Sequence, residues 1–200
     1  MNIAITGHAS GIGSGLYNFY KNENCIGFDL ANGYDVNTDI NDILIKSKHC
    51  NIFINNAYSK HKQAELALAW HKLHTHDDFL LVNISSTFIN LSKDEQLKIK
   101  SPCLMEYIKY KTKLKQASES INSNNDRCKS VNILVGLTNT QFINNWSDQF
   151  TPYELDYFTK LIAECNLLEI SDVVNTVDFV IQSNNNRRFI SDITLSNKIG

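Results

Sequence analysis

Tyr107 and Lys111 have the residue types and the spacing that proton-transfer chemistry requires. Residues four apart share one face of a helix. A phenol titrates near pKa 10 in model peptides and is a poor base at neutral pH, but a nearby ammonium group favours the phenolate. Such a tyrosine can take a proton from an alcohol or give one to a carbonyl. The competing interpretation is a solvated helix face, because lysines stand at 109, 111, 113 and 115. Tyr110 has no lysine four residues later, and we assign it to packing or to a pocket wall.

A phosphate-binding pattern lies at residues 3–16, where a short apolar run precedes glycines at 7, 11 and 13. This order predicts a strand, a tight turn and a helix N-terminus. Gly7 and Gly11 let the backbone turn sharply and approach a ligand, and Gly13 lets the helix pack close to the strand. The free N–H groups and the positive dipole end of the helix then face a pyrophosphate. Ser10 and Ile12 belong to the same expected site.

Asp29 ends a second apolar run, at the distance from the glycine turn where a carboxylate accepts hydrogen bonds from an adenosine ribose. A carboxylate there repels a 2′-phosphate, so it favours NAD over NADP. The alternative is that Asp29 is only a turn residue.

Apolar runs alternate with helical patterns, which predicts an α/β fold: one Rossmann-like, doubly wound parallel sheet of about seven strands with helices on both faces. We expect a single dinucleotide-binding domain over residues 1–200, with no internal repeat or linker. The strands are predicted near 2–6, 25–29, 33–36, 51–55, 79–85, 130–135 and 188–194. The helices are predicted near 12–21, 38–47, 61–74, 104–122, 151–164 and 171–182.

The T-G-x-x-x-G-x-G wording of the glycine turn resembles the short-chain dehydrogenase/reductase family, and further landmarks follow in the family's order. Asn55-Asn56-Ala57 stand where the family has N-N-A-G, with Tyr58 in place of the glycine. The remaining matches are Ser86 after Val82-Asn83-Ile84-Ser85, the pair Tyr107 and Lys111 for Y-x-x-x-K, and Gly136 and Thr140 after the sixth strand.

The resemblance implies roles for these residues. Ser86 would donate a hydrogen bond to the substrate oxygen where negative charge develops, and Lys111 would reach the nicotinamide ribose. Asn55 and Ala57 would line the adenosine side of the groove, and Gly136 and Thr140 would lie by the nicotinamide carboxamide.

Two further positions bear on the cofactor. Asp35-Val36 resembles the family's aspartate that contacts the adenine amino group, with a turn as the alternative. Ser10 supports NAD, because NADP-preferring relatives often carry Arg or Lys there.

Two departures from the family pattern stand out. The stretch between Ser86 and Tyr107 is longer than in most compact members, and we expect residues 87–103 to form a loop or short helix over the substrate mouth. Many members carry an asparagine on the helix before the serine strand, where it helps to hold a proton-relay water. The corresponding segment here has none, so the relay is absent or runs through Ser59 or His61, and turnover is slow or lost.

The resemblance therefore implies an NAD(H)-dependent oxidoreductase that interconverts an alcohol and a carbonyl by hydride transfer, with Tyr107 as acid and base. The longer spacing between Ser86 and Tyr107 leaves open a nucleotide-sugar epimerase or reductase with bound NAD. The departures also leave open a regulatory protein that binds a dinucleotide without catalysis.

The composition excludes other classes of function. The chain has 200 residues and a net charge of −2, which gives no electrostatic case for nucleic acid or anionic membrane. No apolar run is long enough to span a membrane, and the chain enters its first strand without room for a signal peptide. Five scattered cysteines favour reduced thiols and a cytoplasmic location.

Two further expectations concern metals and assembly. We expect no metal site, since His71, His74 and His76 with Asp77 and Asp78 cross a helix end. We expect a homodimer through the helices at 61–74 and 104–122, with a face of Ala64, Ala67 and Leu68.

Overall fold

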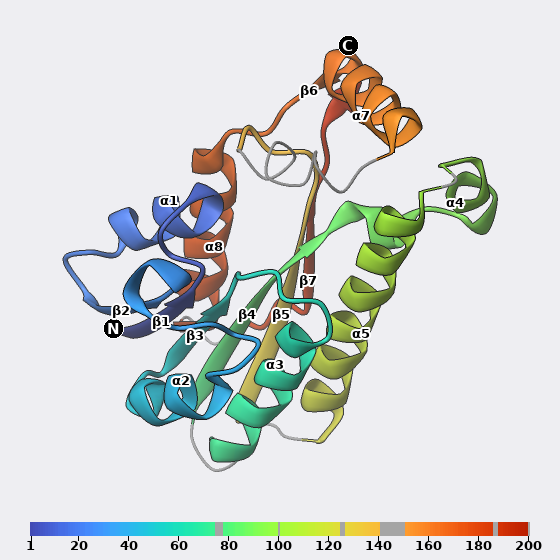
Figure 1. The fold of residues 1–200 in the computed structure, drawn as a ribbon. Helices are drawn as coiled ribbons and strands as arrows, with labels where there is room; N and C mark the ends of the chain where they lie inside the picture. The colour runs from blue at the N-terminus through green and yellow to red at the C-terminus, as the bar shows by residue number, and fades with distance from the viewer. Residues whose placement is uncertain (75–77, 100, 125–126, 141–150, 186–187, 200) are drawn as a thin grey trace.

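The fold is built around one parallel sheet with helices on both of its faces (Figure 1). The computed structural model describes residues 1–74, 78–99, 101–124, 127–140, 151–185 and 188–199. The six strands follow the order β2-β1-β3-β4-β5-β7. Their bounds are β1 Asn2–Thr6, β2 Asn24–Phe28, β3 Ile52–Asn55, β4 Phe79–Ser86, β5 Cys128–Val135 and β7 Asp192–Leu195.

Two groups of helices cover the sheet (Figure 1). On one face, α1 (Gly11–Phe19) and α8 (Ile170–Asn185) bury Leu16 and Val177 against the strands. On the other face, α2 (Ile40–Ser47), α3 (Lys62–Leu73) and α5 (Pro102–Asn124) bury Ile43, Trp70 and Leu114. The predicted doubly wound α/β architecture is therefore confirmed. Within the described residues, no helix is both long and apolar enough to cross a lipid bilayer.

The remaining elements are short or lie beside the sheet. Helix α7 (Pro152–Glu164) starts with a capping box in which Thr151 and Glu154 satisfy each other's backbone N–H groups. The other elements are η1 (Leu30–Asn32), η2 (Thr87–Asn90), α4 (Lys93–Ile99) and the antiparallel pair β6 (Cys165–Asn166) and β8 (Lys198–Ile199).

The predicted strand at 33–36 is wrong, so the sheet has one strand fewer than expected. Gly33 adopts a left-handed conformation with φ 85° and ends η1. The Asp35 N–H then donates to Asp39 Oδ2 (2.7 Å), and the Asp39 N–H donates to the Asp35 carbonyl oxygen (2.7 Å). These bonds close a turn directly before α2, so no length of chain is left for a paired strand.

The face expected for a dimer is also partly wrong. Leu68 is exposed, but Ala67 is fully buried and Ala64 is 8 % exposed. Ala67 belongs to the core cluster between α3 and the sheet and is not available to a partner.

The strand register brings the ends of neighbouring strands to one edge of the sheet. Thr6 pairs with Phe28, Asn55 with Asn83, and Ser86 with Val135. In open α/β sheets, ligands bind in the crevice outside these carboxyl ends.

Candidate functional site

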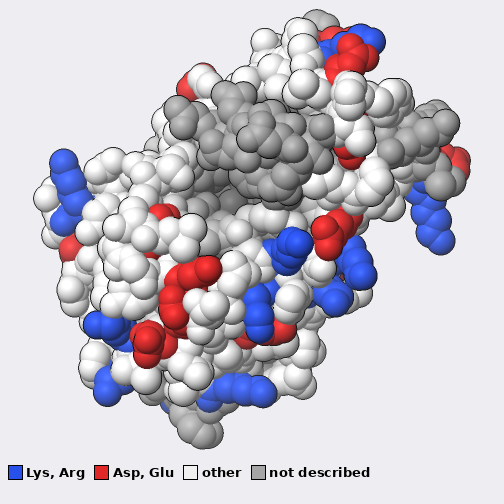
Figure 2. Space-filling model, viewed as in Figure 1, with Lys and Arg blue, Asp and Glu red and all other residues white. Residues whose placement is uncertain are grey.

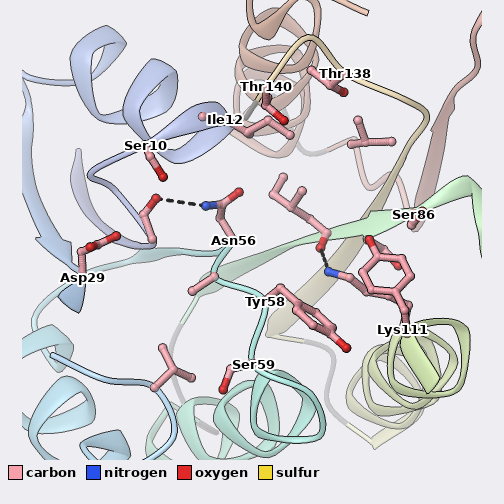
Figure 3. Close-up of a pocket in the computed structure, with 18 of the residues that line it drawn as sticks. Ser10, Ile12, Asp29, Asn56, Tyr58, Ser59, Ser86, Lys111, Thr138 and Thr140 are labelled. Carbon is pink, nitrogen blue, oxygen red and sulfur yellow. Dashed lines mark hydrogen bonds between the residues drawn. The ribbon is translucent and has the colours of Figure 1, made fainter. Parts of the chain in front are cut away.

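A cleft of about 880 Å³ lies at the carboxyl ends of the strands. In Figure 3, Asp29 and Ser10 lie at one end, Ser86 and Lys111 lie at the other, and Asn56 and Tyr58 lie between them. On the face shown in Figure 2, basic and acidic residues are interspersed and no large area carries one sign of charge.

The glycine turn has the geometry of an anion site. Gly7 (φ 71°) and Gly11 (φ 53°) both have positive φ and line the cleft, and the Gly7 N–H donates to the Phe28 carbonyl oxygen (2.7 Å). A Cβ on Gly13 would overlap the Gly7 carbonyl oxygen, so this glycine brings α1 against the turn. The first-turn N–H groups of a helix have no intrahelical partner. Here they face a cleft lined by Ser10, Gly11 and Ile12 and can bind a phosphate.

Asp29 is a turn residue that also lines the cleft. Its Oδ1 accepts from the Ala31 N–H (3.0 Å) and caps η1, while its Oδ2 lies 3.3 Å from the Ala9 N–H of the glycine turn. The residue also lines the cleft, so the two backbone contacts hold the carboxylate at its rim.

Asp35 and Val36 line the same end of the cleft. Asp35 is also a turn residue, because its Oδ1 accepts from the Asn37 N–H (2.8 Å).

Asn55 does not line the groove, which corrects the expectation for this residue. Its side chain is fully buried, and Nδ2 donates to the Gln63 carbonyl oxygen (2.9 Å) and to Asn83 Oδ1 (3.0 Å). The following residues, Asn56 and Ala57, line the cleft instead.

Asn56 is a positioning residue that the sequence analysis did not single out. Its Nδ2 donates to the carbonyl oxygens of Thr6 (3.1 Å) and Gly7 (3.3 Å), which ties the end of β3 to the glycine turn (Figure 3).

Ser86, Tyr107 and Lys111 converge at the other end of the cleft. Ser86 ends β4, and its side chain is hydrogen-bonded to that of Tyr107 on α5. Lys111, one turn further along α5, is 3 % exposed, and its Nζ donates to the Ile84 carbonyl oxygen (2.8 Å; Figure 3). The spacing of the tyrosine and lysine therefore places both side chains on the cleft face of one helix.

Gln63 is the side chain beside Lys111 that sequence reasoning missed. Its Oε1 accepts from Lys111 Nζ (2.9 Å), and its Nε2 donates to the Asn55 carbonyl oxygen (2.8 Å) and lies 3.3 Å from that of Ile84. Gln63 is also the only carboxamide in the helix over residues 62–73, which was the available signal. This helix therefore lacks the asparagine of many family members but supplies another carboxamide, Gln63, which contacts the lysine directly.

Burial shifts both titratable groups in the direction of their neutral forms. It lowers the pKa of Lys111 to about 7 and raises the pKa of Tyr107 to about 12, although the hydrogen bond with Ser86 acts against the second shift. Neutral forms are favoured because charge is poorly solvated in this interior.

Tyr58, which stands where the resembled family has glycine, faces this end of the cleft. Its ring centroid is 5.0 Å from that of Tyr107 and 5.5 Å from Lys111 Nζ. By contrast, Tyr110 points away from the cleft, since its hydroxyl donates to Glu106 (3.1 Å) and the residue is absent from the described lining.

The segment that follows β5 forms another wall of the cleft. It contains Gly136 and Thr140 together with Leu137 and Thr138. Thr140 faces the glycine turn, because its Cγ2 would lie 3.6 Å from a Cβ placed on Gly11. The predicted cofactor residues thus surround one cavity, except for buried Asn55 and for Gly13, which acts through packing.

The insert at 87–103 lies only partly where we expected it. Phe88 of η2 lines the cleft, but none of the α4 side chains that the structure describes does. Of the histidines considered for a metal, His74 is buried with Nδ1 2.9 Å from the Trp70 carbonyl oxygen, whereas His76 and Asp77 lie outside the described residues.

Comparison with solved structures identifies the fold. The chain is similar to the 3-alpha-hydroxysteroid dehydrogenase of Pseudomonas sp. B-0831, solved with NADH, at 14 % identity, with 97 % of this chain and 94 % of that chain covered and a TM-score of 0.68. It is also similar to the aldohexose dehydrogenase of Thermoplasma acidophilum, at 14 % identity, with 98 % and 92 % of the chains covered and a TM-score of 0.67.

A third similar structure is a short chain dehydrogenase of Burkholderia cenocepacia J2315 in complex with NADP, at 10 % identity, with 96 % and 86 % of the chains covered and a TM-score of 0.66. No family model matches the sequence, and no curated protein matches it. The chain therefore has the fold of short-chain dehydrogenases and reductases, although its sequence identity to these three structures is only 10–14 %.

Proposed function

We propose that this protein is an oxidoreductase that prefers NAD(H) and interconverts an alcohol and a carbonyl compound. The observation that carries the proposal is the convergence of Ser86, Tyr107 and Lys111 at one end of a cleft whose other end holds a glycine turn and Asp29.

The described residues fit a nicotinamide dinucleotide. Gly7 and Gly11 leave the start of α1 open to a pyrophosphate, and the cavity of about 880 Å³ is within the size range of cofactor sites. When bound, the dinucleotide would supply or accept the hydride. The protein residues would orient the reactants and move the proton.

Each of the three converging side chains has a separate task. The Tyr107 hydroxyl gives its proton to the carbonyl oxygen during reduction and takes it back during oxidation. Ser86, already hydrogen-bonded to Tyr107, donates to the same substrate oxygen. Lys111, held by Gln63 and Ile84, lies with Nζ 5.6 Å from the Tyr107 ring centroid and stabilises the phenolate when it is protonated.

The charge distribution supports a preference for NAD(H). Among the described residues that line the cleft, Lys111 is the only lysine or arginine, and it lies at the end opposite Asp29. No described lining residue beside Asp29 offers a positive charge to a 2′-phosphate. The carboxylate–phosphate repulsion is on the order of a few kcal/mol, or roughly a hundredfold or more in affinity.

Turnover with matched tyrosine variants tests the proposal. We expect reduction of carbonyl compounds by NADH to fall by at least about a hundredfold in Tyr107→Phe, in line with the usual contribution of a general acid. Tyr110→Phe on the same helix should retain the wild-type rate, and NADH affinity should be similar in all three proteins. Full activity of Tyr107→Phe would remove this residue from the reaction. NADH binding without turnover on any compound would favour the non-catalytic alternative.

A further inference from the structure

The cleft continues past Tyr107 into an apolar end that the proposed function leaves unassigned. Its described walls come from η2, the start of α5, the segment after β5, and α7. The side chains that they contribute are Phe88, Leu104, Leu137 and Phe158.

Phe88, Leu104 and Phe158 form a packed cluster against the tyrosine. Leu104 and Phe158 are only 4 % and 5 % exposed, and the Phe88 and Phe158 rings meet edge to face with centroids 6.4 Å apart. Tyr107 packs against the same cluster, and its ring also neighbours that of Tyr58.

A buried polar contact fixes the position of Phe158. The Ser101 hydroxyl donates to the Glu154 carboxylate, which is 2 % exposed and also accepts from the Thr151 N–H (2.6 Å). These bonds anchor the first turn of α7 beside the start of α5. Phe158 lies one helical turn after Glu154 on α7, so these hydrogen bonds hold it in the wall of the cleft.

The charged side chains that line the cleft are not among those that form its apolar end. Among the described lining residues the ionisable acids and bases are Asp29, Asp35 and Lys111, apart from the tyrosines. The two aspartates lie at the glycine-turn end, and Lys111 already donates to Gln63 and Ile84. A charged substituent placed against Phe88, Leu104 and Phe158 would lose its hydration and find no described partner.

We propose, on the basis of the function proposed above, that the substrate is an uncharged ketone or secondary alcohol with an alicyclic or aryl hydrocarbon group beside the reacting carbon. In reduction, the carbonyl carbon takes a hydride with its two electrons from the reduced nicotinamide dinucleotide, and the C=O π bond opens. The oxygen takes the proton of Tyr107. The hydrocarbon group then lies against Phe88, Leu104 and Phe158.

A matched panel tests this substrate class: an alkyl-substituted cyclohexanone, the cyclohexanone carboxylate of similar size, and a free aldose. We expect kcat/KM for the neutral cyclohexanone to exceed that for either of the other two by at least about tenfold. Phe158→Ala should raise KM for this substrate by about tenfold or more while leaving NADH affinity unchanged. Phe158→Leu should recover much of the loss, and Phe179→Ala, at an exposed position of α8, should match the wild type.

Ligand-observed NMR on the NAD-loaded protein separates this proposal from the function that it rests on. Preferential binding of the neutral cyclohexanone without turnover would support the apolar pocket and overturn the proposed reaction. Faster turnover of the carboxylate or the aldose would support the reaction and overturn the apolar substrate. Equal binding of all three compounds, or a Phe158→Ala variant with unchanged KM, would also overturn it.

Discussion

The Gln63 carboxamide oxygen lies 2.9 Å from Lys111 Nζ, so a side chain of α3 holds the ammonium group that approaches Tyr107 on α5. The same carboxamide donates to the Asn55 carbonyl oxygen (2.8 Å), which fixes its orientation from the end of β3. Lys111 is thereby held directly by the end of β4 and, through Gln63, by the end of β3.

Charge at position 63 should control the pH range of the reaction. Gln63→Glu places a carboxylate beside Lys111 and raises the pKa of the ammonium, which burial holds at about 7 in the wild type. The ammonium then persists to higher pH, so we expect the basic limb of the kcat/KM profile for alcohol oxidation to move up by at least about one unit. Gln63→Met removes a hydrogen-bond acceptor and should move it down. Superimposable profiles would show that Lys111 does not titrate in the reaction.

The free energy of unfolding should also depend on pH because of the lowered pKa of Lys111. The unfolded lysine titrates near 10.4 and the folded one near 7, so between these values the unfolded state binds more protons and stability rises with pH. From about pH 7 to about pH 8.5 the gain is about 1–2 kcal/mol. Lys111→Met should lack this increment. The measurement is the difference in free energy of unfolding between the two proteins at each pH, and a constant difference would contradict the burial effect.

Gly13 should tolerate no side chain. A Cβ there would overlap the Gly7 carbonyl oxygen, so Gly13→Ala must displace α1 from the turn and is expected to cost about 1–3 kcal/mol or more and to weaken dinucleotide binding. Gly33→Ala is the control, because Gly33 has φ +85° but no atom near a new Cβ. It should lose about 1–2 kcal/mol through backbone strain and leave dinucleotide affinity intact. Calorimetric titration and thermal unfolding of both variants distinguish the two effects.

Asp29 should set the choice of cofactor. We expect NADH to bind at least roughly a hundredfold more tightly than NADPH in the wild type. Asp29→Ala combined with Ser10→Arg should narrow or reverse the ratio, because a repelling carboxylate is lost and a cation enters the glycine turn. Fluorescence titration gives both affinities, and equal wild-type values would show that Asp29 does not face the ribose.

Local patterns predicted much of this structure. The glycine turn, Asp29 and the pair Tyr107 and Lys111 follow from spacing along one element, and the structure places all of them around one cleft. The α/β architecture followed equally from the alternation of apolar runs and helical patterns.

The features that were missed depend on tertiary contacts or on register. Which of Asn55 and Asn56 faces the cleft depends on a register step of one residue at the end of β3, where a single step reverses the side chain. Gln63 acts across the gap between two helices, which no spacing along the chain reveals. The strand expected at 33–36 was lost to the turn that Asp35 and Asp39 close.

A crystal structure of the protein with NADH tests the central claim most directly. We expect the pyrophosphate at the start of α1, the adenosine ribose at Asp29, and the nicotinamide ring beside the hydroxyl groups of Ser86 and Tyr107. A dinucleotide bound with its nicotinamide directed away from Tyr107, or bound outside this cleft, would contradict it.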